Sequence, residues 1–494
     1  MRFVRFSLLL PLLAQPFPAG ADSALSVPGI GTYAPSAFRV TTGQCSDCPA
    51  PRQGLWYFQQ DSIAVPQAGQ PLSGFDKRLT LDAEAKAALA SNPSGLPSLI
   101  LLGAPELLPD ARFASNYRVS SDSSSGQWQL VPRLKSNRSW YDRHSAAFFG
   151  TQPLKLRGEW KNQQQVFEVR SIWPRSFGIS PSLPLQPLRA DENLQSLVQA
   201  DQGGARLPFN SRLLWRKPGS TAVLDGKAAI GIMLNGAQGD DDEAHGGHIA
   251  MATGRIGPQG NFSDLLISNF YSLDIYSEKG IVAAVTPLDN YLGDLNSGQQ
   301  WYRPSYMLLA VLNNDRPANV TQDALNRVMN RFYRHDVVYN HSKLNCTGLS
   351  IDTLRSLGWN IPLAGNSGEF VSRIGFALSA IAGGSIDSGR GTFDYLQAEL
   401  SRLLPAVGFR EAGGDLLNLA QQRTGRQLSV YEQQLASSLE ALYFIRIPQF
   451  PSSRKWGQAP VFSNFEYIKR TPLKESERQI IPVDKRPFPA ALRD

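Results

Sequence analysis

One cysteine of this chain stands where the sequence changes from loop to helix. Cys346 follows Asn345 and opens an amphipathic run that ends near Leu357. Upstream of it, His248 opens an apolar run, residues 248–254, which has the length of a strand. A helix N-terminus favours the thiolate form of a cysteine, and an imidazole on a neighbouring strand can accept its proton. This order predicts an α+β fold in which the histidine strand faces the cysteine helix.

Two motifs resemble those of permuted NlpC-type papain-like proteins, a group that includes lecithin–retinol acyltransferase and bacterial exported hydrolases. Residues 248–254, HIAMATG, resemble the histidine strand of that group, and residues 339–346, YNHSKLNC, resemble its tyrosine-to-cysteine motif. The resemblance covers residues 228–362. Unpermuted papain-like enzymes carry the cysteine before the histidine, so the order here implies the permuted arrangement. Chymotrypsin-like cysteine peptidases also place histidine first, but their cysteine lies in a Gly-rich barrel loop rather than at a helix.

The resemblance implies a role for each of three residues. Cys346 would be the nucleophile and His248 the base, while a polar group on the next strand would fix the imidazole tautomer. Asn269 is the best positional match for that third group, and Ser268 is the alternative. The acyltransferase branch carries a second histidine at this place, whereas asparagine is familiar in papain-like peptidases, so the difference favours hydrolysis. The backbone N–H of Cys346 would donate to the oxyanion.

Other polar residues near the motifs are candidates for substrate binding. They are His245, Tyr339, His341 and Asn345. His245 is also an alternative to His248 as the base, although the apolar run begins at His248. A metal site is the other alternative, because Asp240, Asp242, His245 and His248 are close in sequence and of types that bind zinc. An acidic run before a strand is usually a solvated loop, so we expect no metal and no other cofactor.

The N-terminus has the pattern of an export signal. Arg2 and Arg5 precede a short apolar run, and residues 19–21, AGA, fit a cleavage site. We therefore expect a signal peptide over residues 1–21 and a periplasmic protein, with a retained anchor as the alternative. The apolar run is shorter than the roughly 20 residues of a spanning helix, so no transmembrane span is expected.

The remaining two cysteines, Cys45 and Cys48, are close in sequence. In an oxidising compartment we expect them to form a disulfide with each other, which leaves Cys346 as the unpaired thiol. A redox motif would need a surrounding βαβ pattern, and a zinc site would need two further ligands nearby. Neither is evident in the sequence.

Composition excludes some classes of protein. Hydrophobic residues make up 42% of the 494 residues and charged residues 18%, which argues for a globular protein rather than long disorder. The formal charge is +7, and loss of Arg2 and Arg5 with the signal peptide would leave +5. This small excess points to no particular partner, and no basic helix or aromatic–basic repeat argues for nucleic-acid binding.

The chain divides into three regions after the signal peptide. Residues 22–205 contain short apolar runs separated by turn signals, which predict one or two small β domains of barrel or sandwich type. Residues 206–365 form the α+β region that resembles a permuted papain-like domain. Residues 366–494 are expected to be helical with an extended basic tail, and the nearly apolar run 370–381 is expected to be a core helix rather than a membrane-surface helix. Further helices are expected over residues 393–404 and 431–442.

These features together predict an exported cysteine hydrolase that cleaves amide or ester bonds in the bacterial cell envelope. Peptidoglycan peptides are the first candidate substrate, and lipid or lipoprotein esters are the second. An acyltransferase or lipid esterase of the same fold is one alternative, and a non-catalytic envelope scaffold is another. The sequence leaves the oligomeric state open. A thiol-directed electrophile discriminates an enzyme from a scaffold, because only an activated thiol reacts much faster than an ordinary exposed one.

Overall fold

The computed structural model describes most of the chain from residue 125 to residue 490. Before residue 125 it describes residues 32–33, 63–66, 88–89, 99–102, 106–113 and 118–120. After residue 125, the gaps in the described part are residues 135–140, 164, 221–222, 276–281, 334, 383, 473 and 491–494. The expected signal peptide and the Cys45–Cys48 pair lie outside the described residues.

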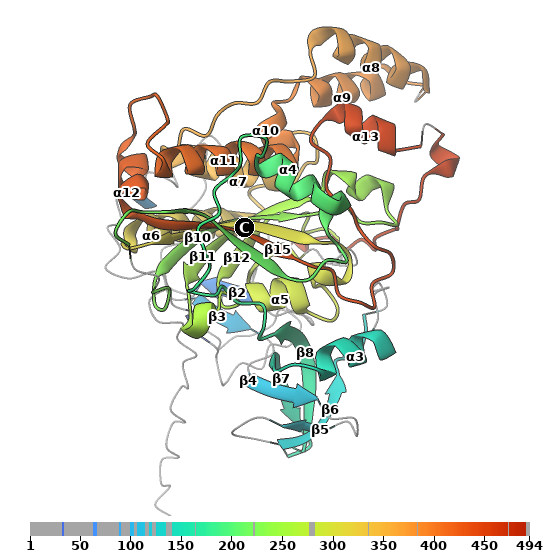
Figure 1. The fold of residues 1–494 in the computed structure, drawn as a ribbon. Coiled ribbons are helices and arrows are strands. Elements are labelled where there is room, and N and C mark those ends of the chain that lie inside the picture. The colour runs from blue at the N-terminus through green and yellow to red at the C-terminus, as the bar shows by residue number, and fades with distance from the viewer. Residues whose placement is uncertain are drawn as a thin grey trace, which may run out of the picture.

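A mixed sheet forms the centre of the molecule, and a small closed barrel packs against one side of it (Figure 1). The strand order of the sheet is β1-β3-β2-β13-β12-β11-β10-β14-β15-β9, and neighbours are antiparallel except for β1 and β3. These strands are β1 (Thr32–Tyr33), β2 (Ile63–Pro66), β3 (Leu99–Leu102), β9 (Asn210–Arg216), β10 (Ala228–Asn235), β11 (His248–Arg255), β12 (Leu266–Asn269), β13 (Ala284–Pro287), β14 (Ser305–Leu312) and β15 (Leu439–Ile447). The order of the barrel is β4-β5-β6-β8-β7. Its strands are β4 (Glu106–Phe113), β5 (Arg118–Ser120), β6 (Ser125–Leu130), β7 (Leu154–Lys161) and β8 (Val166–Pro174).

Helices cover the face of the sheet opposite the barrel (Figure 1). Helices α6, α7 and α11 lie on that face, whereas α5 lies between the sheet and the barrel. The helices are α3 (Arg143–Gly150), α4 (Leu194–Gln199), α5 (Leu288–Gly293), α6 (Arg316–Tyr333), α7 (Cys346–Ser356), α8 (Glu369–Ala382), α9 (Ile386–Gln397), α10 (Leu400–Leu403), α11 (Pro405–Ala420), α12 (Val430–Ser438) and α13 (Asn464–Arg470). No helix in the described part of the chain is long and apolar enough to cross a membrane.

The central strands are apolar on both faces because each face covers a separate core. Ile230 and Ile232 of β10 belong to the core that includes Leu349 of α7, whereas Ala229 and Met233 of the same strand belong to the core shared with the barrel. Successive residues of a strand point to opposite faces, so a strand covered on both sides has no polar alternation. This explains why residues 228–234 form a continuous small and apolar run.

Buried ion pairs fix the barrel to the sheet. Asp289 of α5 is 2.8 Å from Arg157 Nε and 3.0 Å from Lys155 Nζ, both on β7. Arg170 of β8 donates from Nε to Asp294 at 2.7 Å. All five side chains are nearly inaccessible to solvent. Because the cations and the carboxylates come from different parts of the chain, these contacts hold the barrel in one orientation.

The α+β character and the barrel are confirmed, but several finer expectations were wrong. The N-terminal and C-terminal regions both complete the central sheet, because β2 pairs with β13 and β15 lies between β14 and β9. The helix expected over residues 431–442 ends at Ser438, where the chain continues as β15. The helix expected over 393–404 is divided between α9 and α10. Short apolar runs are compatible with either structure, and strand pairing decides between them.

Candidate active site

The histidine strand begins at a backbone position that only glycine can occupy. Gly247 has φ 73°, and a Cβ built on it would lie 2.4 Å from the carbonyl oxygen of Asn235. The chain can therefore turn tightly into β11, and His248 becomes its first residue, directly opposite Asn235 of β10. His248 is 2% exposed. Its imidazole is thus held on a rigid strand rather than on a loop.

Asn269 holds the imidazole of His248 from the neighbouring strand. The Oδ1 atom of Asn269 is hydrogen-bonded to His248 Nε2, and its Nδ2 atom donates to the carbonyl oxygen of Val282 at 2.6 Å. Since the amide nitrogen is committed to Val282, the oxygen faces the ring, and Nε2 must be the protonated nitrogen. This leaves Nδ1 as the nitrogen available to a thiol. The alternative, Ser268, is also buried, but its hydroxyl has no hydrogen-bond partner among the described residues.

Cys346 is the first residue of α7, and its thiol is buried beside His248. Asn345 caps this helix, because its Oδ1 accepts from the N–H groups of Thr347 and Gly348 at 2.9 and 3.0 Å. Burial by itself raises the pKa of the Cys346 thiol, but the charge of His248 and a hydrogen bond to its ring lower it. The N–H of Ile249 and the hydroxyl of Thr347 also favour the thiolate, and the resulting pKa is about 7.

Tyr339 lies beside the thiol, and the rings of Tyr271 and His341 pack against Tyr339. The rings of Tyr339 and Tyr271 are 5.2 Å apart, and His341 is 5.0 Å from Tyr339. Tyr271 also contacts the ring of His248 edge-on at 6.0 Å. The Tyr339 hydroxyl hydrogen-bonds both the backbone N–H and the side chain of Cys346. Burial raises the pKa of Tyr339 well above its ordinary value, and the charge of Cys346 raises it further, so the hydroxyl keeps its proton.

A chain of buried polar groups supports the strand beneath the imidazole. The Tyr291 hydroxyl donates to Asn235 Oδ1, and Asn235 Nδ2 donates to Ser305 Oγ at 2.7 Å. Ser305 donates in turn to Gln300 Oε1 at 2.7 Å. The chain joins β10, β14 and α5, so it keeps the start of β11 from shifting against its neighbours. The sequence gives no signal for this chain, since its members are far apart.

A buried arginine adds positive charge to this region. Arg303 is 1% exposed, its Nη1 donates to the carbonyl oxygen of Gly236 at 3.3 Å, and its Nε has no partner among the described residues. Burial lowers the pKa of Arg303, although the charges of Tyr291, Asp241 and Cys346 oppose this effect. An arginine stays protonated in proteins, so its charge favours the thiolate of Cys346. No motif in the sequence predicts this residue.

His245 makes its contacts elsewhere. Its Nε2 is 3.2 Å from Asp242 Oδ1, and its ring packs edge-on against Tyr467 of α13 at 5.9 Å. Burial lowers the pKa of His245, and Asp242 opposes that effect. The structure therefore brings His248, rather than His245, to the thiol. Of the other substrate-binding candidates, Tyr339 hydrogen-bonds Cys346, Asn345 caps the helix that begins at Cys346, and His341 packs against Tyr339.

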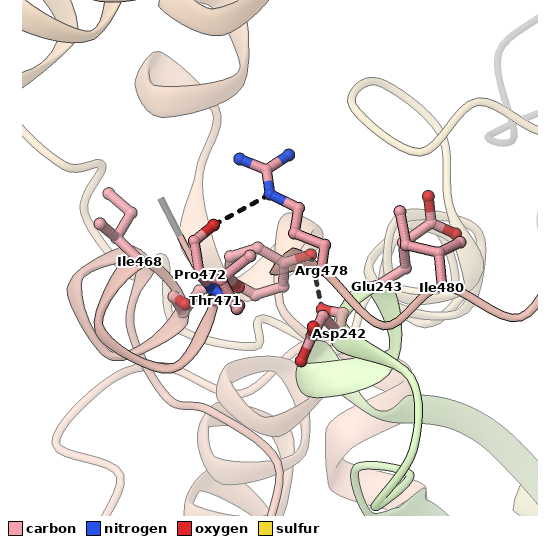
Figure 2. Close-up of a pocket in the computed structure, with 8 residues that line it drawn as sticks. Asp242, Glu243, Ile468, Thr471, Pro472, Arg478 and Ile480 are labelled. Atoms are coloured by element: carbon pink, nitrogen blue, oxygen red, sulfur yellow. Dashed lines mark hydrogen bonds between the residues drawn. The ribbon is translucent and has the colours of Figure 1, made fainter. Parts of the chain in front are cut away.

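The C-terminal tail covers the loop that carries His245. Asp242 and Gln479 exchange two hydrogen bonds, from Asp242 N to the Gln479 carbonyl at 2.8 Å and from Gln479 N to Asp242 Oδ2 at 2.7 Å. Figure 2 shows the pocket between this loop and the tail, with Arg478 bonded to the Pro472 carbonyl at its rim. The pocket is lined by Asp242, Glu243, Tyr467, Ile468, Thr471, Pro472, Arg478 and Ile480, so it is separate from the thiol site.

The four residues considered for a metal site, Asp240, Asp242, His245 and His248, are divided among three separate contacts. Asp240 pairs with Arg454 at 3.1 Å, Asp242 with His245, and His248 with Asn269. In the described part of the chain, no group of three or more histidine, cysteine or acidic side chains is arranged to hold a metal ion.

Comparisons of the chain with protein-family models, with curated proteins and with solved structures give no match.

Proposed function

We propose that this protein is a thiol enzyme that attacks amide or ester carbonyls. Cys346 is the nucleophile, His248 the base, and Asn269 the residue that orients the imidazole. The observation that carries the proposal is the position of His248 between the amide oxygen of Asn269 and the thiol of Cys346. A nucleophile paired with a base, which is itself held by a third group, is the arrangement that nucleophilic catalysis requires.

Cys346 and His248 supply the nucleophile and the proton transfers for both halves of the reaction. His248 accepts the thiol proton while the sulfur attacks the carbonyl carbon, and the negative charge develops on the carbonyl oxygen. That oxygen displaces the Tyr339 hydroxyl from the backbone N–H of Cys346, so that the N–H and the hydroxyl both donate to it. Collapse of the intermediate expels the amine or alcohol, which takes the proton from His248, and leaves a thioester on Cys346. Water, or an acceptor hydroxyl or amine, then attacks the thioester and loses its proton to His248. Collapse of this second intermediate breaks the carbon–sulfur bond and releases the acid, ester or amide, and the Cys346 sulfur recovers its proton from His248.

We propose a substrate in the bacterial cell envelope, in keeping with the export signal expected over residues 1–21. Peptides of peptidoglycan are the first candidate, because an asparagine as the third member of the triad, here Asn269, favours hydrolysis of peptide bonds. Acyl chains on lipids or lipoproteins are the second candidate.

Alkylation of the thiol tests the proposal. Iodoacetamide should modify Cys346 at neutral pH much faster than it modifies an exposed cysteine of a peptide, with the site assigned by mass spectrometry. The same protein should be incubated with muropeptides and, separately, with acyl esters. Cys346→Ala should abolish turnover of the true substrate, whereas the double variant Cys45→Ser/Cys48→Ser should retain it. An ordinary alkylation rate together with no turnover would favour the scaffold alternative. Turnover that EDTA removes and zinc restores would favour the metal alternative.

A further inference from the structure

The thiol of Cys346 is closed off from solvent. Cys346 is 3% exposed, and His248 is 2% exposed. A reacting carbonyl carbon must come within about 3–3.5 Å of the sulfur, so part of the protein has to move before a peptide or acyl chain can react there. The segment that follows α13 is the part in question, because it contacts the loops on both sides of the catalytic strands.

The two catalytic strands bring their polar residues to the same end of the sheet. Strands β11 and β12 are antiparallel neighbours, so His248, which begins β11, lies near Asn269, which ends β12. The loop before β11 contains Asp242, and the loop after β12 contains Asp274. A segment that joins these two loops therefore crosses the end of the sheet at which the imidazole is held.

Residues 479–488 of the C-terminal tail make this crossing, and we name them the strap. The strap begins at Gln479, whose two hydrogen bonds with Asp242 hold it to the loop before β11. Its residues form neither a helix nor a strand of the sheet. Ile481 is 6% exposed, whereas the preceding Ile480 is 43% exposed. The strap therefore lies against the protein between its two ends.

The far end of the strap is held by the loop after β12. Lys485 forms an antiparallel bridge with Ile275, and the N–H of Arg486 donates to the carbonyl oxygen of Asp274 at 2.6 Å. The N–H of Phe488 donates to Asp274 Oδ1 at 3.3 Å. The strap is therefore fixed on both sides of the catalytic histidine and asparagine.

The strap also contacts the loop that leads to Cys346. Phe488 is 4% exposed and belongs to the same apolar core as Cys346, and its ring is 5.0 Å from that of His335. His335 lies between α6 and α7, and its Nε2 is 3.5 Å from Asp274 Oδ1. The strap therefore contacts one loop beside each of the three elements that carry the proposed catalytic residues.

We propose that the strap is an autoinhibitory closure of the thiol site, and that release of its Phe488 end admits the substrate. This inference rests on the proposed function, because it concerns access to Cys346. The side chain of Asp274 is 45% exposed, so water competes for its contacts with the strap and with His335. The observed rate of reaction at the thiol is then its intrinsic rate multiplied by the fraction of molecules in which the strap is open.

A disulfide that locks the strap tests this proposal. The double variant Ile275→Cys/Lys485→Cys places two thiols at bridge partners, whose Cβ atoms lie about 4.5–5.5 Å apart in antiparallel pairs, near the spacing of a disulfide. A biotin-linked maleimide should modify Cys346 at least about tenfold more slowly in the oxidised variant than in the same protein after reduction, because the lock removes the open fraction. Mass spectrometry would assign the modified site. The unaltered protein, taken through the same reduction, should change by less than about twofold.

Phe488→Ala should act in the opposite direction, since it removes the buried ring at the far end of the strap and so raises the alkylation rate of Cys346 by roughly fivefold or more. The matched control is Phe462→Ala, which removes a ring of the same core that is also 4% exposed but precedes α13. It should lower the temperature of unfolding to a similar extent and leave the alkylation rate unchanged.

Equal rates at Cys346 in the oxidised and reduced double variant would overturn the strap. An equal effect of Phe488→Ala and Phe462→Ala on the alkylation rate would also overturn it, because the ring would then act only through general stability. Failure of the proposed function gives a different result. The disulfide would still control alkylation, but Cys346 of the reduced protein would react no faster than an exposed cysteine of a peptide, and no substrate would be turned over.

Discussion

The hydroxyl of Tyr339 accepts a hydrogen bond from the backbone N–H of Cys346. In a thiol enzyme this N–H of the nucleophile donates to the oxyanion of the intermediate. The same hydroxyl also hydrogen-bonds the side chain of Cys346. A substrate carbonyl that reached the sulfur would therefore meet the phenol at the position where its oxygen becomes charged. Because the pKa of Tyr339 lies well above its ordinary value, the phenol remains a donor throughout the neutral range.

Tyr339→Phe should lower kcat by about 100-fold, because one donor to the oxyanion is lost while the thiol and imidazole remain. Steady-state kinetics on the substrate that the unaltered protein turns over would measure this. The matched control is Tyr431→Phe, which removes a buried hydroxyl bonded to Thr321 at 2.6 Å and leaves the thiol site intact. A kcat within about twofold of the unaltered value would remove Tyr339 from the mechanism, since loss of one such donor is worth far more.

The alkylation rate of Cys346 should rise through pH 7. The pKa of this thiol is lowered from 9.0 to about 7, so the thiolate fraction grows with pH in that range and is lost below it. His248→Ala should move the midpoint upward, because burial of the thiol is then unopposed by the imidazole. The same shift makes the free energy of unfolding depend on pH. Between the folded-state pKa of about 7 and the ordinary value of 9.0, the folded state binds fewer protons than the unfolded state, so the protein becomes more stable as pH rises through this range. A midpoint near 9 in the unaltered protein would contradict this account.

The sequence was sufficient for the parts of the site that lie on regular elements. His248 at a strand start and Cys346 at a helix start follow from local pattern, and the choice of Asn269 follows from the family resemblance. The structure places His248 first in β11, Cys346 first in α7 and Asn269 last in β12. Arg303 and the Tyr291–Asn235 contact were missed, because they depend on loops that meet only after the sheet has formed. Hydrophobic periodicity in the sequence does not predict contacts between residues on distant loops.

The C-terminal region shows the same limit for the fold. Residues 439–447 have apolar side chains on both faces, which is compatible with a buried helix as well as with a central strand. Pairing with β14 and β9 decides the matter, and both partners are distant in sequence. For α8 the apolar pattern predicted a helix correctly but a core position wrongly, since Phe370, Leu378 and Ile381 are 76, 64 and 80% exposed.

Asn269→Ala should reduce kcat by an intermediate amount, less than Cys346→Ala or His248→Ala. The imidazole stays on β11 but loses the oxygen that fixes its tautomer, so only part of the population has Nδ1 free for the thiol. Ser268→Ala is the matched control on the same strand, since the Ser268 hydroxyl has no partner among the described residues. Kinetics across pH would separate an orienting role from a purely structural one. If Ser268→Ala were the more damaging change, the assignment of the third group would have to be exchanged.

Asp289→Asn should destabilise the protein by about 3–5 kcal/mol, because it leaves the buried cations of Lys155 and Arg157 without a full counter-charge. The free energy of unfolding in urea would measure this. Asp110→Asn is the matched control: Asp110 also pairs with an arginine, Arg175, but its side chain is 50% exposed, and water screens the pair. Its loss should cost about 0–1 kcal/mol. Equal losses for the two variants would mean that the contacts between the barrel and the sheet are as solvated as a surface ion pair, and that the barrel is held by its apolar contacts alone.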